Sequence, residues 1–253
     1  DACPDDPWRP VSPPLYQTAS FEQPDALGGG PYDYSRSGNP TRAALERQLA
    51  RLDGAAHGLA YTSGMAALSA LTRLVAPGER ILAGSDLYGG CFRLLHRVCA
   101  PLGIRVAHVD TSDLDAVRAA LPGTRLLLVE TPSNPLQRIA DIAALADLAH
   151  AHGAWLAVDN SLLSPYLCRP LALGADLAVQ SATKHLAGHS DLTAGVITTS
   201  DRALHERLAF LQNAEGTALA PFPAWLLQRG LCTLALRIDR QQQSARALAE
   251  LLV

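Results

Sequence analysis

The chain has 253 residues, of which 48% are hydrophobic and 18% charged, and its formal net charge is −3. This composition is typical of a globular protein with one substantial core and excludes a disordered chain. Acidic and basic residues are interspersed, so the sequence argues against a nucleic-acid or membrane partner and favours a small-molecule ligand.

The five cysteines are odd in number, widely spaced and without a C-x-x-C pair. This pattern predicts reduced thiols in a reducing compartment, with no disulfide framework and no zinc site. No apolar run is long enough to span a bilayer, and the first residues lack the charged and then apolar pattern of a secretion signal. We therefore expect neither a metal ion nor a membrane partner.

The first forty residues are rich in proline and glycine and predict an extended arm. A helix is expected from Asn39 to Leu52, with Gly54 ending it. Short apolar segments then predict strands at Leu59–Thr62, Arg80–Ala83, Val106–Val109, Leu126–Glu130, Trp155–Asp159, Leu177–Gln180 and Gly195–Thr198. Helices are expected at about Met65–Val75, Cys91–Pro101, Leu114–Ala120 and Ile142–His152, with longer helical stretches after Arg202.

Alternating strands and helices predict an α/β fold, a mostly parallel sheet with helices on both faces. Ligands of such sheets bind beyond the carboxyl ends of the strands, so functional side chains are expected there. Residues 238–251 have the pattern of a helix without a stop signal, and we expect more chain after them. The predicted division is an arm over 1–45, a ligand-binding α/β domain over 46–235, and the start of a truncated C-terminal domain over 236–253.

The basic residues comprise 20 arginines and one lysine, Lys184. A guanidinium stays protonated and cannot form an imine, so a lone lysine in an arginine-rich chain indicates a need for a primary amine, for example as a Schiff base. The alternative is a surface lysine that remains by chance. Ser181 and Thr183 flank Lys184 directly after a predicted strand, and their hydroxyls can bind phosphate oxygens.

Three further features follow predicted strands. The turn 62–65 leads into a helix whose amides and dipole can hold a phosphate, or else it is an ordinary N-cap. Tyr88, followed by two glycines, can stack on a planar heterocycle or lie buried in its loop. Asp159 ends an apolar strand, where it can pair with a protonated pyridine nitrogen or cap a helix. His185 and His189 are interpreted as packing residues.

Seven segments carry a family resemblance: PLYQTASF (14–21), YDYSRSGNPT (32–41), YTSGMAAL (61–68), DLYGG (86–90), ETPSNP (130–135), VDNSLLSP (158–165) and SATKHLAGHSD (181–191). With them the chain resembles the cysteine and methionine metabolism group of pyridoxal phosphate enzymes, which includes cystathionine γ-synthase, cystathionine β-lyase and methionine γ-lyase. Residues 210–242, FLQNAEGTALAPFPAWLLQRGLCTLALRIDRQQ, resemble the plant plastid form of cystathionine β-lyase in particular.

The resemblance implies an aspartate-aminotransferase-like fold (fold type I) with pyridoxal 5'-phosphate as the cofactor. It implies that Lys184 carries the cofactor, Asp159 contacts the pyridine nitrogen and Tyr88 stacks on the ring, with Asn134 near the ring hydroxyl. The phosphate contacts it implies are Gly64, Met65, Ser181 and Thr183, with Tyr34 and Arg36 from a neighbouring subunit. Lys184, Tyr88 and Tyr34 are the expected catalytic residues.

The activity implied by the resemblance is that of a carbon–sulfur lyase. It would cleave L-cystathionine by β-elimination to homocysteine, pyruvate and ammonia, as part of transsulfuration in methionine biosynthesis. The alternatives are a γ-synthase or γ-lyase of the same family, or a truncated non-catalytic subunit, since the family's C-terminal domain carries the arginine that binds the substrate carboxylate. A homodimer or homotetramer with shared sites is expected, in the plastid stroma if plant-type and otherwise in the cytoplasm.

Overall fold

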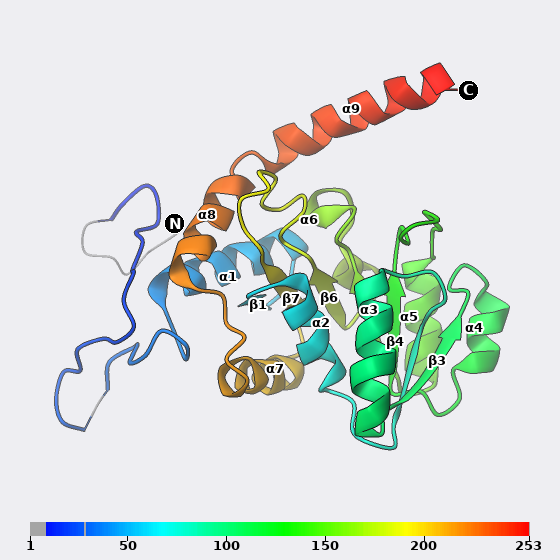
Figure 1. The fold of residues 1–253 in the computed structure, drawn as a ribbon, viewed down its shortest axis with the longest axis horizontal. Helices are drawn as coiled ribbons and strands as arrows, with labels where there is room; N and C mark the ends of the chain where they lie inside the picture. Colours follow the sequence, from blue (N-terminus) through cyan, green and yellow to red (C-terminus); the bar gives the residue numbers. More distant parts are fainter. Residues whose placement is uncertain (1–8, 28, 253) are drawn as a thin grey trace.

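A seven-stranded sheet forms the centre of the computed structural model, which describes residues 9–27 and 29–252 (Figure 1). The strand order is β1-β7-β6-β5-β4-β2-β3; β7 runs antiparallel to both its neighbours, β1 and β6, and the other strand pairs are parallel. The strands are β1 His57–Tyr61, β2 Arg80–Gly84, β3 Arg105–Val109, β4 Leu126–Glu130, β5 Trp155–Asp159, β6 Leu177–Gln180 and β7 Gly195–Thr199. The predicted mostly parallel α/β sheet is confirmed.

Each predicted strand is present, and the bounds of β4, β5 and β6 are those expected from the apolar runs. These three central strands are covered on both faces, so their apolar runs begin and end sharply. Strand β1 ends at Tyr61 rather than Thr62, which leaves Thr62 in the turn before the next helix.

Helices cover the sheet where the sequence predicts them. The α-helices are α1 Pro40–Asp53, α2 Gly64–Thr72, α3 Gly89–Leu94, α4 Leu114–Ala120, α5 Ile142–Ala151, α6 Ser164–Leu167, α7 Arg202–Ala214, α8 Pro221–Leu231 and α9 Leu234–Leu252. The short α6 and the 3-10 helix Pro170–Leu173 were not predicted. Both are only four residues long, too short for a helical period to be read from sequence.

The prediction of one regular helix over Cys91–Pro101 is wrong for the second half of that range. After α3 the chain forms a π-helix at Leu95–Cys99 and a 3-10 helix at Ala100–Leu102. Pro101 has no amide hydrogen and its ring collides with the carbonyl of the preceding turn, so a regular α-helix cannot continue through it.

Two separate cores pack on the two faces of the sheet. Along β2, Ile81 and Ala83 lie in the core beside α2 and α3, whereas Leu82 lies in the core beside α4 and α5. Consecutive strand residues point to opposite faces, so this alternation shows that both faces are covered. A third cluster beneath α1 and α8 includes Ala60 of β1 and Val196 of β7.

Between residue 9 and α1, which begins at Pro40 inside the expected 1–45 range, the described chain forms bends, turns and an isolated bridge. Residues 1–8 and Gly28 of the expected arm lie outside the described part of the chain. The arm is attached to α1, because the Tyr16 amide donates to Thr41 Oγ1 at 2.9 Å and Asn39 Nδ2 donates to Tyr16 O at 3.0 Å. Helix α9 projects from the body of the molecule in Figure 1.

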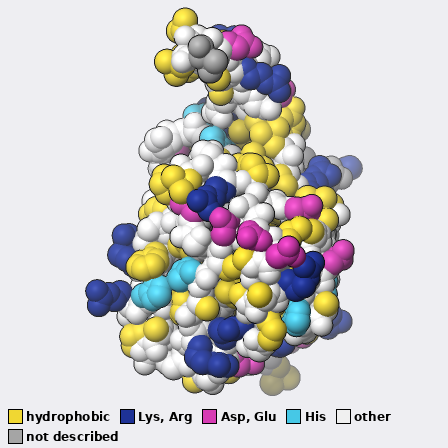
Figure 2. All heavy atoms as spheres, turned by 90° about the vertical axis from the view of Figure 1, so that its right-hand side faces the viewer, with side chains coloured by type: hydrophobic (Ala, Val, Ile, Leu, Met, Phe, Trp, Pro, Cys, Tyr) yellow, Lys and Arg dark blue, Asp and Glu magenta, His cyan; other side chains and the backbone are white. Residues whose placement is uncertain are grey.

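Charges of both signs lie next to one another on the face shown in Figure 2. This mixed surface agrees with the interspersed charges in the sequence. Within the described residues, no helix combines the length and apolar character needed to cross a bilayer.

Candidate active site

Three neighbouring parallel strands end at one edge of the sheet and bring several polar residues together. Glu130, the last residue of β4, is paired in register with Asp159, the last residue of β5. Ser181 follows β6 directly, and β6 is paired with β5. The strand ends therefore place two carboxyl groups and the segment that carries Lys184 at the same edge, where ligands of such sheets bind.

Asp159 is half-buried, and burial raises the pKa of its carboxyl group. The Ser161 amide and hydroxyl donate to its Oδ1 at 3.0 and 2.6 Å, and both hydrogen bonds favour the ionised form. A cation beside this carboxylate would offset the desolvation cost. The protonated ring nitrogen of pyridoxal phosphate fits that requirement.

Ser161 is a functional candidate that the sequence analysis missed. Its hydroxyl donates to Asp159 and also accepts from the Ser181 amide at 2.7 Å, so it links the ends of β5 and β6. A hydroxyl residue two positions after a strand-end aspartate is the sequence signal for such a turn. Ser161 thus orients the aspartate and positions the lysine segment together.

Glu130 is the second residue that was missed. Burial and the nearby charge of Asp159 raise the pKa of its carboxyl group to about 7, while hydrogen bonds oppose the rise. The Tyr88 amide donates to Glu130 Oε2 at 2.8 Å. Its signal in the sequence was the acidic residue at the end of an apolar strand, the same pattern that identified Asp159.

Lys184 lies in a turn directly after β6, with an exposed side chain. Its amide donates to Ser181 O at 3.1 Å, and Arg237 of α9 donates to the carbonyl oxygens of His185 at 2.7 Å and Leu186 at 3.3 Å. The backbone around the lysine is therefore tied down while the amine remains accessible. Such an arrangement suits a nucleophilic amine.

The turn between β1 and α2 forms a cradle for an anion. Ser63 caps α2, because its Oγ accepts from the Ala66 amide at 3.1 Å. Among the described residues no partner is found for the amides of Gly64 and Met65, which lie in the first turn where the helix dipole favours negative charge. A Cβ on Gly64 would lie 2.9 Å from the Ser181 Cβ, so the cradle needs glycine and has Ser181 as its wall.

Thr183 contacts the residue before β7 in this structure, and its expected phosphate contact stays a prediction. Its hydroxyl donates to Ala194 O at 3.2 Å and accepts from the Ala194 amide at 3.0 Å. The hydroxyl proton is therefore engaged with the start of β7. A hydrogen bond from Thr183 to a phosphate would require only that the hydroxyl proton turn away from Ala194 O, because Oγ1 can keep accepting from the Ala194 amide.

Tyr88 stands at the start of α3 with its side chain 47% exposed, which leaves a ring face free for stacking. A Cβ on Gly90 would lie 2.3 Å from Tyr88 Cε1 and 2.9 Å from Met65 Sδ, so the tyrosine ring packs beside the anion cradle. Asn134 is exposed in the loop after β4. Asp86 joins the two loops, because it accepts from the Ser133 hydroxyl and from the Leu136 amide.

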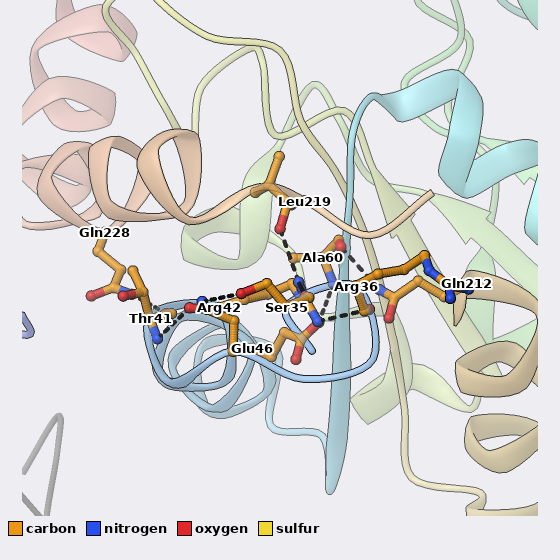
Figure 3. A network of polar contacts seen from close by, with 10 residues as sticks. Ser35, Arg36, Thr41, Arg42, Glu46, Ala60, Gln212, Leu219 and Gln228 are labelled. Atoms are coloured by element: carbon orange, nitrogen blue, oxygen red, sulfur yellow. Dashed lines mark hydrogen bonds and ion pairs between the residues drawn. The ribbon is translucent and has the colours of Figure 1, made fainter. Parts of the chain in front are cut away.

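Tyr34 and Arg36 lie in the arm. Figure 3 shows how the base of the arm is held: Arg42 donates to Ser35 O at 2.7 Å, to Arg36 O at 3.1 Å and to Leu219 O at 3.2 Å. The Arg36 guanidinium donates to Asn213 O at 2.8 Å and lies 5.6 Å from the centre of the Tyr34 ring. The structure describes one chain, so a contribution of this pair to a neighbouring subunit stays a prediction.

The family described as Cys/Met metabolism PLP-dependent enzymes matches residues 3–253 of the chain. The chain belongs to this family. A chloroplastic cystathionine β-lyase of Arabidopsis thaliana is 54% identical over 245 residues, which cover 96% of this chain and 53% of the relative. A cystathionine γ-lyase of Bacillus subtilis is 43% identical over 243 residues, covering 96% of this chain and 64% of that protein.

A solved structure of a related enzyme has the same fold as this chain. A cystathionine γ-synthase of Xanthomonas oryzae, crystallised with aminoacrylate and cysteine, superposes with a TM-score of 0.93 at 39% identity and covers 96% of this chain and 63% of its own. The chain thus has the fold of this family's solved members and spans about half the length of its plant relative. Pyridoxal phosphate is the family's cofactor, and the anion cradle, Asp159 and Lys184 fit its phosphate, ring nitrogen and aldehyde respectively.

Proposed function

We propose that the chain forms the cofactor-binding part of a carbon–sulfur lyase that cleaves L-cystathionine by β-elimination to homocysteine, pyruvate and ammonia. The observation that carries this proposal is the edge of the sheet where Ser161 links Asp159 to Ser181, at the start of the segment that carries Lys184, in a chain 54% identical to a chloroplastic cystathionine β-lyase. The reaction would serve methionine biosynthesis.

When bound, pyridoxal phosphate supplies a conjugated ring that accepts the electron pair released at the substrate Cα. Asp159 would hold a proton at the ring nitrogen, since its carboxylate is oriented by two hydrogen bonds from Ser161. Lys184 Nζ, at the end of an exposed side chain, would take the proton from Cα. Tyr88 would lie along the ring face and accept a proton from the incoming amine.

Protonation of the departing thiolate falls to Lys184 or a tyrosine. Tyr88 is the candidate in the chain's own site, and Tyr34 of a neighbouring subunit is the other candidate. The amides of Gly64 and Met65, with Ser181, would hold the phosphate and so fix the position of the ring relative to Lys184.

A γ-synthase or γ-lyase is the second candidate. The relatives that carry these names share the fold and are 39% and 43% identical to this chain. The cofactor contacts described above do not depend on which bond of the substrate breaks, so only the products distinguish the candidates.

We also propose that the protein assembles as a homodimer or homotetramer in which Tyr34 and Arg36 complete a neighbour's site. A plastid stroma location follows from the chloroplastic relative if the protein is plant-type, and the cytoplasm otherwise. Mixing an Arg36→Ala protein with a Lys184→Ala protein tests the shared site, because mixed dimers then contain one intact site. Failure to recover activity would count against sharing.

The deciding experiment is a visible absorption spectrum of the purified full-length protein with pyridoxal phosphate, before and after adding L-cystathionine, with Lys184→Ala as the control. We expect an absorption band that requires Lys184, and pyruvate as the product. Release of 2-oxobutyrate would indicate a γ-lyase, and synthesis of cystathionine from cysteine and an activated homoserine would indicate a γ-synthase. A band without turnover would indicate a non-catalytic subunit, and the absence of a Lys184-dependent band would refute the cofactor assignment.

A further inference from the structure

Glu130 lies between two loops that are far apart in sequence. The Tyr88 amide, in the loop after β2, donates to Glu130 Oε2 at 2.8 Å. The backbone amide of Asn134, in the loop after β4, also stabilises the Glu130 carboxylate. One carboxyl group therefore interacts with the backbone of two residues expected to contact the cofactor ring.

The acidic surroundings of Glu130 raise the free-energy cost of its ionised form. Asp159 is its register partner on β5, and the buried Cys91 lines the same small cavity as Glu130 and Asp159. The charges of Asp159 and Asp86 both raise the pKa of the Glu130 carboxyl group. A half-buried acid with two acidic neighbours is destabilised in its ionised form. Hydrophobic residues pack on both faces of the same strand, and an apolar side chain would avoid that cost.

We propose that Glu130 is a positioning residue that binds the backbone amide of Tyr88 and so sets where the tyrosine ring stacks on the cofactor. The inference rests on the proposed cofactor and adds to it a residue that does not touch the ring. Both oxygens of a carboxylate are acceptors, and the Tyr88 amide donates to one of them, Oε2. Glutamine at the same position has one acceptor and one NH₂ group, which would face a backbone N–H.

The test is titration of the cofactor-free full-length protein with pyridoxal phosphate, followed by absorbance and by circular dichroism of the cofactor band. At about pH 8, above the raised pKa of Glu130, Glu130→Gln should weaken binding about tenfold or more, because it removes a hydrogen bond to a charged acceptor and leaves a donor facing a donor. Glu79→Gln is the matched control, since Glu79 also accepts a backbone amide, that of Ala76 at 2.7 Å, but lies at the start of β2. It should bind like the wild type.

A double-mutant cycle separates positioning from a general structural role. If Glu130 acts through Tyr88, the loss caused by Glu130→Gln should shrink to about twofold or less in a Tyr88→Ala background, where no ring remains to be positioned. Equal losses in both backgrounds would overturn the proposal, and so would wild-type affinity of Glu130→Gln alone.

Hydrogen exchange of the wild-type protein provides the second measurement if Glu130→Gln fails to fold. The Tyr88 amide should exchange slowly although its side chain is 47% exposed, because its N–H donates to Glu130. Rapid exchange of that amide would refute the contact. A wild-type protein that does not bind pyridoxal phosphate would instead refute the proposed function, and the exchange measurement would still decide whether the contact exists.

Discussion

Replacing Asp53 by asparagine should remove a pH-dependent penalty on folding. Asp53 is the last residue of α1 and is 1% exposed. Its Oδ2 accepts from Gln180 Nε2 at 2.9 Å and from Thr198 Oγ1 at 2.7 Å, so it attaches α1 to β6 and β7. Burial raises the pKa of this carboxyl group from 3.8 to about 6, against the opposing effects of Thr198, Arg169 and Gln180.

The sign of the pH dependence follows from the raised pKa. Between pH 4 and 6 the folded protein holds a proton on Asp53 that the unfolded chain has released, so stability falls as pH rises through this range and levels off above it. The difference between a pKa of 3.8 in the unfolded chain and about 6 in the folded protein corresponds to about 3 kcal/mol of unfolding free energy. Asparagine can place its oxygen where Oδ2 lies and keep both donors, while it carries no charge at any pH.

We therefore expect the unfolding free energy of Asp53→Asn, relative to wild type, to increase by up to about 3 kcal/mol between pH 4 and pH 6.5. Urea denaturation at half-unit pH steps, followed by tryptophan fluorescence, measures this difference. The control is Asp115→Asn, because the Asp115 side chain is 90% exposed on α4. A difference between Asp53→Asn and wild type that does not change with pH would refute the reasoning.

Two further predictions concern glycine and arginine contacts near the site. Gly90→Ala should weaken pyridoxal phosphate binding about tenfold or more, because the new Cβ would lie 2.3 Å from Tyr88 Cε1 and displace the stacking ring. Gly89→Ala is the matched control, since its nearest neighbour is 3.8 Å away, and equal binding by both variants would contradict the prediction. Arg237→Ala should destabilise the protein by about 2 kcal/mol, because it removes hydrogen bonds to two carbonyl groups of the lysine loop and to the Gly230 carbonyl of α8. Thermal denaturation alongside Arg240→Ala, whose side chain is exposed, checks it, and equal stability of the two variants would argue against this role.

Much of the candidate site could be predicted because its residues follow sharply bounded strands. Apolar runs with clear ends located β4, β5 and β6, and strand ends of a parallel sheet are where ligands bind. The count of one lysine against 20 arginines identified Lys184 without any structural information. The contacts of Thr183 with Ala194 could not be predicted in this way, because Ala194 lies on the far side of the lysine loop.

The sequence by itself determined the strands, most of the helices and the residue types that suit pyridoxal phosphate, because these depend on local patterns of apolar and polar residues. Only the tertiary structure decided the strand order, the reversed direction of β7 and the contacts that orient the site. Glu130 meets Tyr88 across 42 residues of chain, and Arg237 meets His185 across 52. Such contacts arise from the pairing of β2 with β4 and the return of α9 to the lysine loop, which no local pattern encodes.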